Sequence, residues 1–276
     1  MRWRLTISDN DPKKQPSSVI VAGKDWFTAF EAGLKRQPPG VGLVGGLECV
    51  LYPGNILKII DNLSRRNYDL RPVDAAGFTR SQTESISTAG EIPGRAVLSP
   101  ALGADTISAF ERMQAVTAFE SRHQVAEFGL SLAMQLIRCQ TGLCMLQTSA
   151  KKELCVAAKQ GQSADLFPAQ PVDVDVGFVG FALRMGAVVT VSRSESDPLP
   201  AAEYHAPSTY AVADALCAPL QFEGRTSGAM FLLNRLKESG FSPSDSTTLS
   251  YLTGALAEYM EKKLPGRNAG LEENGG

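Results

Sequence analysis

The segment from Ala215 to Leu249 constrains the fold of this chain more than any other stretch. Two apolar runs, ALCAPLQF and SGAMFLLN, flank a short Glu223-Gly224-Arg225 turn. This pattern predicts a β-hairpin, because glycine accepts the positive φ that tight turns need. A phenylalanine, a Ser-Pro pair and an aspartate then precede leucines at helical spacing. The segment therefore predicts a sheet that ends in a hairpin and is followed directly by a helix.

Changes in composition divide the chain into four regions. Residues 1–73 predict a small α+β domain with the order ββαβββ, because period-two apolar runs surround one helical pattern with Asp25 as its N-cap. Residues 74–104 are rich in Ser, Thr, Gly and Pro and predict a flexible linker. Residues 105–264 predict a second domain, and residues 265–276 predict a disordered tail.

The second domain begins with a predicted helix from residue 105 to about 138. Apolar residues on this helix form two stripes, and a helix that is apolar on two sides must be covered on two sides. We expect the sheet on one side and a partner helix on the other, which predicts a homodimer through helices 105–138 and 245–263. The second stripe consists of Val125, Phe128, Leu132 and Leu136.

The order of predicted elements in residues 105–264 resembles a GAF domain. The residues that carry this resemblance are Gly177, Gly180, Gly186, Asp197, Gly224, Leu232, Asn234, Phe241, Asp245, Leu249 and Leu252. The resemblance implies an α+β fold with an antiparallel sheet of about six strands, helices on one face, and a ligand pocket under loops on the other. GAF domains bind cyclic nucleotides, bilins, haem or amino-acid-like metabolites, or no ligand, and often pair through terminal helices. Residues 1–73 match no family.

A set of four residues is similar to part of the cyclic-nucleotide GAF signature. Asn234, Arg235, Phe241 and Asp245 stand where that signature has Asn-Lys and Phe-x-x-x-Asp-Glu, although Lys is replaced by Arg and Glu by Ser. We assign structural roles to all four. Asp245 lies at the start of the last helix and complements its positive end, an Arg235–Asp245 ion pair replaces the Lys–Asp pair, and Phe241 packs under the helix.

The sequence does not indicate catalysis. The methionine sulfoxide reductase branch of the GAF family needs two cysteines, but Val179 and the segment YAVADALC lack them at the matching places. No CH pair for bilin attachment, CxxC, GxSxG, HExxH or P-loop pattern occurs. We therefore expect no enzyme and no metal site, and the sequence identifies no cofactor.

Charge and hydropathy narrow the choice of partners. The formal net charge is −2, so we do not expect a nucleic-acid partner. No apolar run approaches 18 residues, which predicts a cytoplasmic protein without membrane contact. Arg65, Arg66 and Arg71 suggest either a phosphate contact or a solvated charged turn, and we favour the turn.

These observations predict a non-catalytic regulatory or signalling protein. Its GAF-type module would hold a small molecule or nucleotide between the sheet and the loops at residues 165–180 and 193–214. The alternative is a ligand-free GAF domain that serves as a dimerisation or protein-interaction adaptor and passes its signal to a protein partner. The candidate lining residues are Phe167, Phe178, Phe181, Tyr204, Tyr210 and Asp214.

Overall fold

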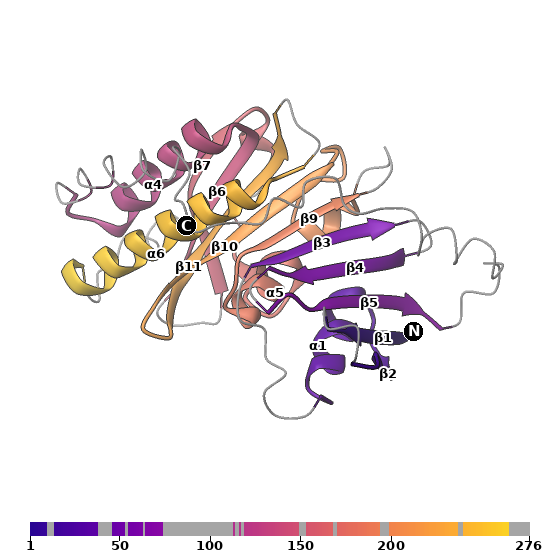
Figure 1. Cartoon of the computed structure of the whole chain (residues 1–276). Coiled ribbons are helices and arrows are strands. Elements are labelled where there is room, and N and C mark those ends of the chain that lie inside the picture. The colour runs from indigo at the N-terminus through magenta and orange to yellow at the C-terminus, as the bar shows by residue number, and fades with distance from the viewer. Residues whose placement is uncertain are drawn as a thin grey trace.

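The structure is a computed structural model (Figure 1). It describes residues 1–9, 14–37, 46–52, 55–62, 64–73, 113, 116, 119–148, 153–167, 170–193, 199–236 and 240–264. The predicted linker at 74–104 and the predicted tail at 265–276 lie outside the described residues.

The N-terminal elements follow the predicted order ββαβββ. They are β1 (Arg2–Ser8), β2 (Ser17–Ala22), α1 (Trp26–Leu34), β3 (Leu47–Tyr52), β4 (Ile56–Asp61) and β5 (Asn67–Pro72). Trp3, Leu5 and Ile7 alternate along β1 and are all buried, as their spacing predicts. Asp25 is the N-cap of α1, where its Oδ1 accepts a hydrogen bond from the Thr28 amide at 2.9 Å.

The second half of the chain contributes three helices, six strands and two short 3₁₀ turns to the described structure. They are α4 (Arg122–Ile137), β6 (Cys139–Gln147), β7 (Glu153–Gly161), η3 (Ala164–Leu166), β8 (Val172–Asp173), α5 (Gly177–Met185), β9 (Val189–Arg193), η4 (Ala201–Tyr204), β10 (Asp214–Phe222), β11 (Arg225–Arg235) and α6 (Pro243–Lys263). The predicted hairpin joins β10 to β11. Glu223 and Gly224 both have positive φ, at 48° and 77°, as a type I′ turn requires.

All eleven strands belong to one sheet, in the order β2-β1-β5-β4-β3-β9-β10-β11-β6-β7-β8. β3 pairs with β9 in parallel, and every other described strand pair is antiparallel. The expectation of a separate sheet of about six strands is therefore wrong in extent, because the sheet continues into the N-terminal half. Pairing β3 with β9 satisfies backbone groups that two separate sheets would leave at open edges. The domain boundary near residue 73 stays a prediction.

Helices cover both faces of the sheet. Leu216 and Ala218 of β10 belong to the apolar cluster under α4 and α6, whereas the alternate residues Ala215 and Cys217 belong to the cluster under α5 and α1. The expectation that helices pack on one face only is therefore wrong. The opposite face, where the resemblance implies a pocket under loops, carries α5 and the N-terminal helix α1.

The predicted continuous helix from residue 105 to 138 is also wrong. Ser121 has an extended backbone, with φ −129° and ψ 149°, and caps α4 at its N-terminus. Its hydroxyl accepts from the Gln124 amide at 3.2 Å, and the Gln124 side chain accepts from the Ser121 amide at the same distance. This capping box starts a new helix at Arg122.

The second apolar stripe of α4 packs within the chain. Val125 and Leu132 are buried in the cluster that α4 shares with α6, and Leu256 of α6 lies directly against Gly129. An ion pair between Arg122 Nη2 and Glu261 Oε1, at 2.9 Å, joins the same two helices. The α6 helix of the same chain thus covers the second apolar stripe of α4, for which the sequence predicts a helix of a partner. The homodimer through helices 105–138 and 245–263 stays a prediction.

Candidate functional site

The candidate site is the α5 face of the sheet, where the described parts of the predicted loops lie, namely residues 165–167, 170–180, 193 and 199–214. Gly177 (φ 68°) opens α5 and Gly186 (φ 61°) closes it in the left-handed conformation that the sequence predicts. Between them, Phe178 and Phe181 point from α5 into the protein and have no exposed surface. The glycines therefore place two aromatic side chains directly over the sheet.

Rings from three parts of the chain fill the space beneath α5. Phe181 lies 5.4 Å from Trp26 and 5.4 Å from Phe27 between ring centroids, and both of these residues belong to α1. Phe178 lies 5.1 Å from Tyr204 and 5.8 Å from Phe231 of β11. These separations are those of packed aromatic pairs. We call this group the aromatic core.

The six predicted lining residues are all buried, and their printed contacts place them in more than one group. Phe178, Phe181 and Tyr204 belong to the aromatic core, while Phe167 and Tyr210 form a separate edge-to-face pair at 5.2 Å. Asp214 begins β10, where it accepts a hydrogen bond from the Arg235 amide at 2.8 Å. Burial raises the pKa of the Asp214 carboxyl to about 6.

Two hollows in the described structure lie elsewhere, and none of the six predicted residues lines either. One, of about 350 Å³, lies between the end of α5 and α6 and includes Gly186, Gln221 and Thr253. The other, of about 440 Å³, lies beside α4 and β7 and includes Leu130 and Lys159. Neither hollow opens beneath the two loops at which a ligand is predicted.

The four predicted motif residues form a structural network. The Asn234 side chain accepts from the Ala213 amide and donates to the Ala211 carbonyl, both at 2.8 Å. Arg235 Nε lies 3.0 Å from Asp245 Oδ2, which is the predicted ion pair. Asp245 also caps α6 together with Ser242, and Phe241 is buried in the cluster under that helix.

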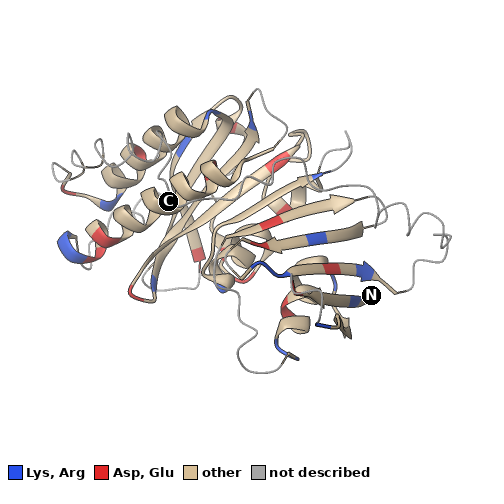
Figure 2. Ribbon diagram, in the orientation of Figure 1, with Lys and Arg blue, Asp and Glu red and all other residues tan. Residues whose placement is uncertain are grey.

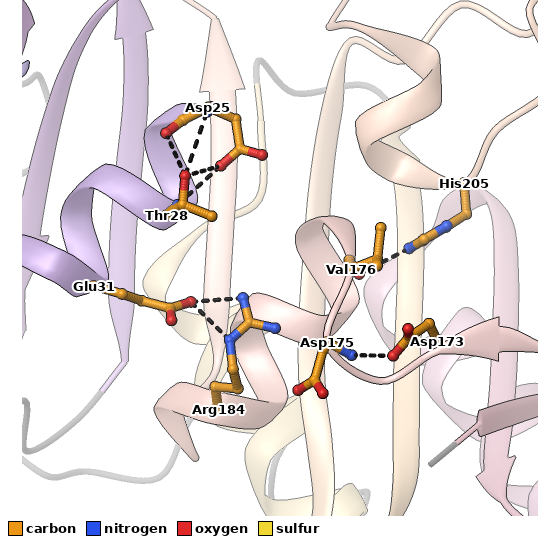
Figure 3. A network of polar contacts seen from close by, with 8 residues as sticks. All are labelled: Asp25, Thr28, Glu31, Asp173, Asp175, Val176, Arg184 and His205. Atoms are coloured by element: carbon orange, nitrogen blue, oxygen red, sulfur yellow. Dashed lines mark hydrogen bonds and ion pairs between the residues drawn. The ribbon is translucent and has the colours of Figure 1, made fainter. Parts of the chain in front are cut away.

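A second polar network joins α1 to α5 (Figure 3). Arg184 of α5 donates from Nη2 and Nε to Oε1 of Glu31, at 2.6 and 2.8 Å. Beside them, the His205 Nε2 lies 3.3 Å from the Val176 carbonyl oxygen, and burial lowers the pKa of the His205 imidazole. The N-terminal helix is thus fixed to the α5 face by both apolar and ionic contacts.

Four of the five cysteines are buried and lack the environment of a reactive thiol. Cys49, Cys139, Cys144 and Cys217 are buried, and burial raises the pKa of each thiol, to about 12 for Cys139 and Cys144. Such thiols stay protonated and unreactive at neutral pH. Among the described residues, no group of three His, Cys, Asp or Glu side chains could hold a metal ion.

Charged residues of both signs are interspersed over the described elements (Figure 2). Arg71 lies near the end of β5 and its Nη2 donates to Asp69 at 2.7 Å, whereas Arg65 and Arg66 precede that strand. The three arginines therefore lie toward opposite ends of β5 and do not form one phosphate cluster. No helix in the described part of the chain is long and apolar enough to cross a membrane.

The sequence interpretation missed Trp26, Phe27 and Phe30 as neighbours of the predicted site. Their aromatic spacing marks α1 as an amphipathic helix, but it does not reveal which surface the helix covers. The contact joins residues about 150 positions apart, such as Glu31 and Arg184. No local pattern in either segment predicts the contact between α1 and α5.

Comparisons with known proteins give structural matches only. No family model matches the chain, and no curated protein matches it. The GAF domain of an Acinetobacter phosphoenolpyruvate-protein phosphotransferase is 13% identical, with a TM-score of 0.47, over 58% of this chain and 94% of that one. A free methionine-R-sulfoxide reductase from Neisseria meningitidis is 16% identical, with a TM-score of 0.47, over 59% of this chain and 93% of that one.

The second GAF domain of DevS from Mycobacterium smegmatis is a further match. It is 16% identical to this chain, with a TM-score of 0.40, over 51% of this chain and 94% of that domain. Identities this low bear on the fold alone. Each TM-score is below 0.5, so these matches are a likeness over about half of this chain and carry no further conclusion.

Proposed function

We propose that this protein is a non-catalytic regulatory protein whose GAF-like half binds no small molecule on its α5 face and acts through protein contacts. The observation that carries this proposal is the packing of aromatic rings of α1 against α5. Trp26, Phe27 and Phe30 lie against Phe181, where a ligand of a GAF-type sensor would be expected. Rings of the N-terminal helix thus pack against α5, beside the predicted ligand position, which favours the adaptor function over the sensor function.

The chemistry of the described residues agrees with a non-catalytic role. The position that a reductase of this fold would fill with a cysteine is Val179, which is fully buried. The thiol of Cys217, three residues after Asp214, is also fully buried, and burial raises its pKa. A thiolate nucleophile needs the reverse conditions, namely solvent access and a lowered pKa.

A ligand screen on the full chain tests this proposal. Thermal unfolding is measured with and without cyclic nucleotides, nucleotides, haem and amino acids, and native mass spectrometry is applied to the purified protein. We expect no rise in Tm with any of these compounds and a native mass that is a whole multiple of the chain mass, with no added compound. A ligand that binds the folded state must raise Tm, so a saturable, concentration-dependent rise would overturn the proposal.

A variant that empties the aromatic core makes the screen sharper. Phe27→Ala removes a ring that packs against both Phe178 and Phe181 without touching the cysteines. If α1 stands in the place of a ligand, this variant gains a hollow and becomes able to bind small aromatic compounds such as indole, while the unaltered protein does not. Binding of indole by both proteins with equal affinity would contradict the proposed role of α1.

A further inference from the structure

Strand β2 forms one end of the eleven-stranded sheet. β1 pairs with one side of it, and no described strand pairs with its other side. At the opposite end of the sheet, the edge strand β8 has only two residues and offers little backbone to a partner. Among the described strands, β2 is therefore the edge at which another strand can be added.

The register of β1 decides which backbone groups of β2 point outward. The Val73 amide donates to the Arg2 carbonyl at 2.8 Å, so Arg2 directs its backbone groups toward β5. Because these directions alternate along an antiparallel strand, Trp3 and Leu5 direct theirs toward β2. Their partners in the register are Val21 and Val19, which therefore face β1. The residues of β2 whose backbone N–H and C=O groups point away from β1 are therefore Ser18, Ile20 and Ala22.

The outer edge of β2 is apolar and lightly protected. The strand, SSVIVA, contains no charge, proline or glycine, which are common means of blocking an edge. The Ile20 side chain is 46% exposed. Among the described residues, one side chain bonds to this edge: Arg36, just after α1, donates from Nη1 to the Ile20 carbonyl at 2.6 Å. Arg36 is itself exposed, so this contact is easily released.

We propose that β2 is a homodimerisation edge, at which two copies of this chain pair in antiparallel fashion about a two-fold axis through Ile20. In this register Ile20 lies opposite Ile20 of the second copy, Val19 lies opposite Val21, and Ser18 lies opposite Ala22. Outward-pointing residues then meet outward-pointing residues, so each exchanges two hydrogen bonds with its counterpart. The Ile–Ile and Val–Val pairs bring β-branched side chains together, which stabilises sheets.

A second copy fits this edge better than an unrelated peptide. The strand is complementary to itself when centred on Ile20, and its lack of charge gives it no means of selecting a charged partner sequence. The edge lies far from α4 and α6 (Figure 1), so this dimer differs from one formed through those helices. The proposal does not depend on whether the α5 face binds a ligand.

A register-specific cross-link tests the proposal. Cα atoms of a hydrogen-bonded antiparallel pair lie about 5.5 Å apart, within the range of disulfides. Ile20→Cys in the full chain should therefore give a covalent dimer under mild oxidation. Ser18→Cys is the matched control, because the two copies of residue 18 would lie about 13 Å apart. The unaltered chain, with its five cysteines, provides the background. Equal cross-linking of both variants, or none with Ile20→Cys, would overturn the register.

Sedimentation equilibrium provides the second measurement. Ile20→Lys places two ammonium groups opposite each other at the axis, and should raise the dimer dissociation constant at least about tenfold. Arg36→Ala removes the side chain that caps the edge and should lower the constant. Leu236→Lys is the matched control, since Leu236 is 41% exposed and lies after β11; it should leave the constant unchanged. A monomer at every concentration, or a dimer that Ile20→Lys does not weaken, would refute the proposal.

Discussion

Replacing Phe181 with alanine tests whether the α5 face is core or binding site. The side chain is fully buried and its ring lies 5.4 Å from Trp26, 5.4 Å from Phe27 and 6.0 Å from Phe30. Truncation of a buried phenylalanine costs about 3–5 kcal/mol, and three lost ring contacts place this residue at the upper end of that range. We therefore expect Phe181→Ala to lower the free energy of unfolding by about 4–5 kcal/mol.

Urea unfolding with two probes measures this effect. Both tryptophans of the chain, Trp3 and Trp26, are buried in the N-terminal half, so their fluorescence reports on that half. Circular dichroism at 222 nm reports mainly on α4 and α6, the two longest described helices. Because one apolar cluster joins α1 to α5, both probes should show the same midpoint, lowered by about 1.5–2 M for m of about 2–3 kcal/mol/M.

Phe222→Ala is the matched control for this truncation. Phe222 ends β10, is only half-buried, and has the Lys262 ammonium 5.0 Å from its ring centroid. Its replacement should cost only about 0.5–1 kcal/mol. The reasoning fails if Phe181→Ala costs no more than Phe222→Ala. It also fails if the dichroism midpoint moves while the fluorescence midpoint does not, since the two halves would then unfold independently.

Three further predictions concern polar groups, each measured by denaturant unfolding. Glu31→Gln should lower the free energy of unfolding by about 1–3 kcal/mol, because Arg184 loses a charge-assisted hydrogen-bond partner. A double-mutant cycle with Arg184→Met should give a coupling energy of at least about 1 kcal/mol, and strictly additive effects would contradict this. Asn234→Ala should lower the free energy of unfolding by about 3 kcal/mol, because alanine is strained at a φ of 58° and the Ala213 amide and Ala211 carbonyl lose their partner. Asn234→Gly should relieve the backbone strain but not restore these hydrogen bonds. The pKa of the Asp214 carboxyl is about 6 in the folded state against 3.8, so its contribution to the free energy of unfolding should fall by about 2 kcal/mol as pH rises from 4 to 7. Asp214→Asn should lack that decline, and an identical pH dependence of both proteins would contradict the shift.

Local features of the structure could be predicted from the sequence because their causes are local. Asp25 caps α1, Gly186 closes α5, and the Arg235–Asp245 pair forms, each within a segment of about ten residues. The start of α4 could have been predicted as well. Ser121 and Gln124 have the spacing of a capping box, and that signal lies inside the stripe that predicts one long helix.

The joining of the two halves could not be predicted in the same way. β3 meets β9 through residues such as Leu47 and Val189, which are far apart in the chain. Each strand alone looks like an ordinary buried strand, and the free energy of their pairing depends on surfaces that neither segment encodes by itself. The same limit affected the site. In the sequence, aromatic residues of the segment 165–214 are equally consistent with ligand contact and with core, and in the structure they belong to the cluster that contains the rings of α1.

The parallel seam between β3 and β9 has a consequence for how the chain could be divided. The Leu47 amide donates to the Val188 carbonyl at 2.8 Å, and Thr190 Oγ1 donates to the Leu47 carbonyl at 3.3 Å. Through this seam and the rings of α1, the two halves share one sheet and one apolar cluster, as parts of a single folding unit do. Two separately expressed pieces, residues 1–73 and 105–276, should therefore reconstitute each other by fragment complementation, and neither should be an independent module to be moved to another protein.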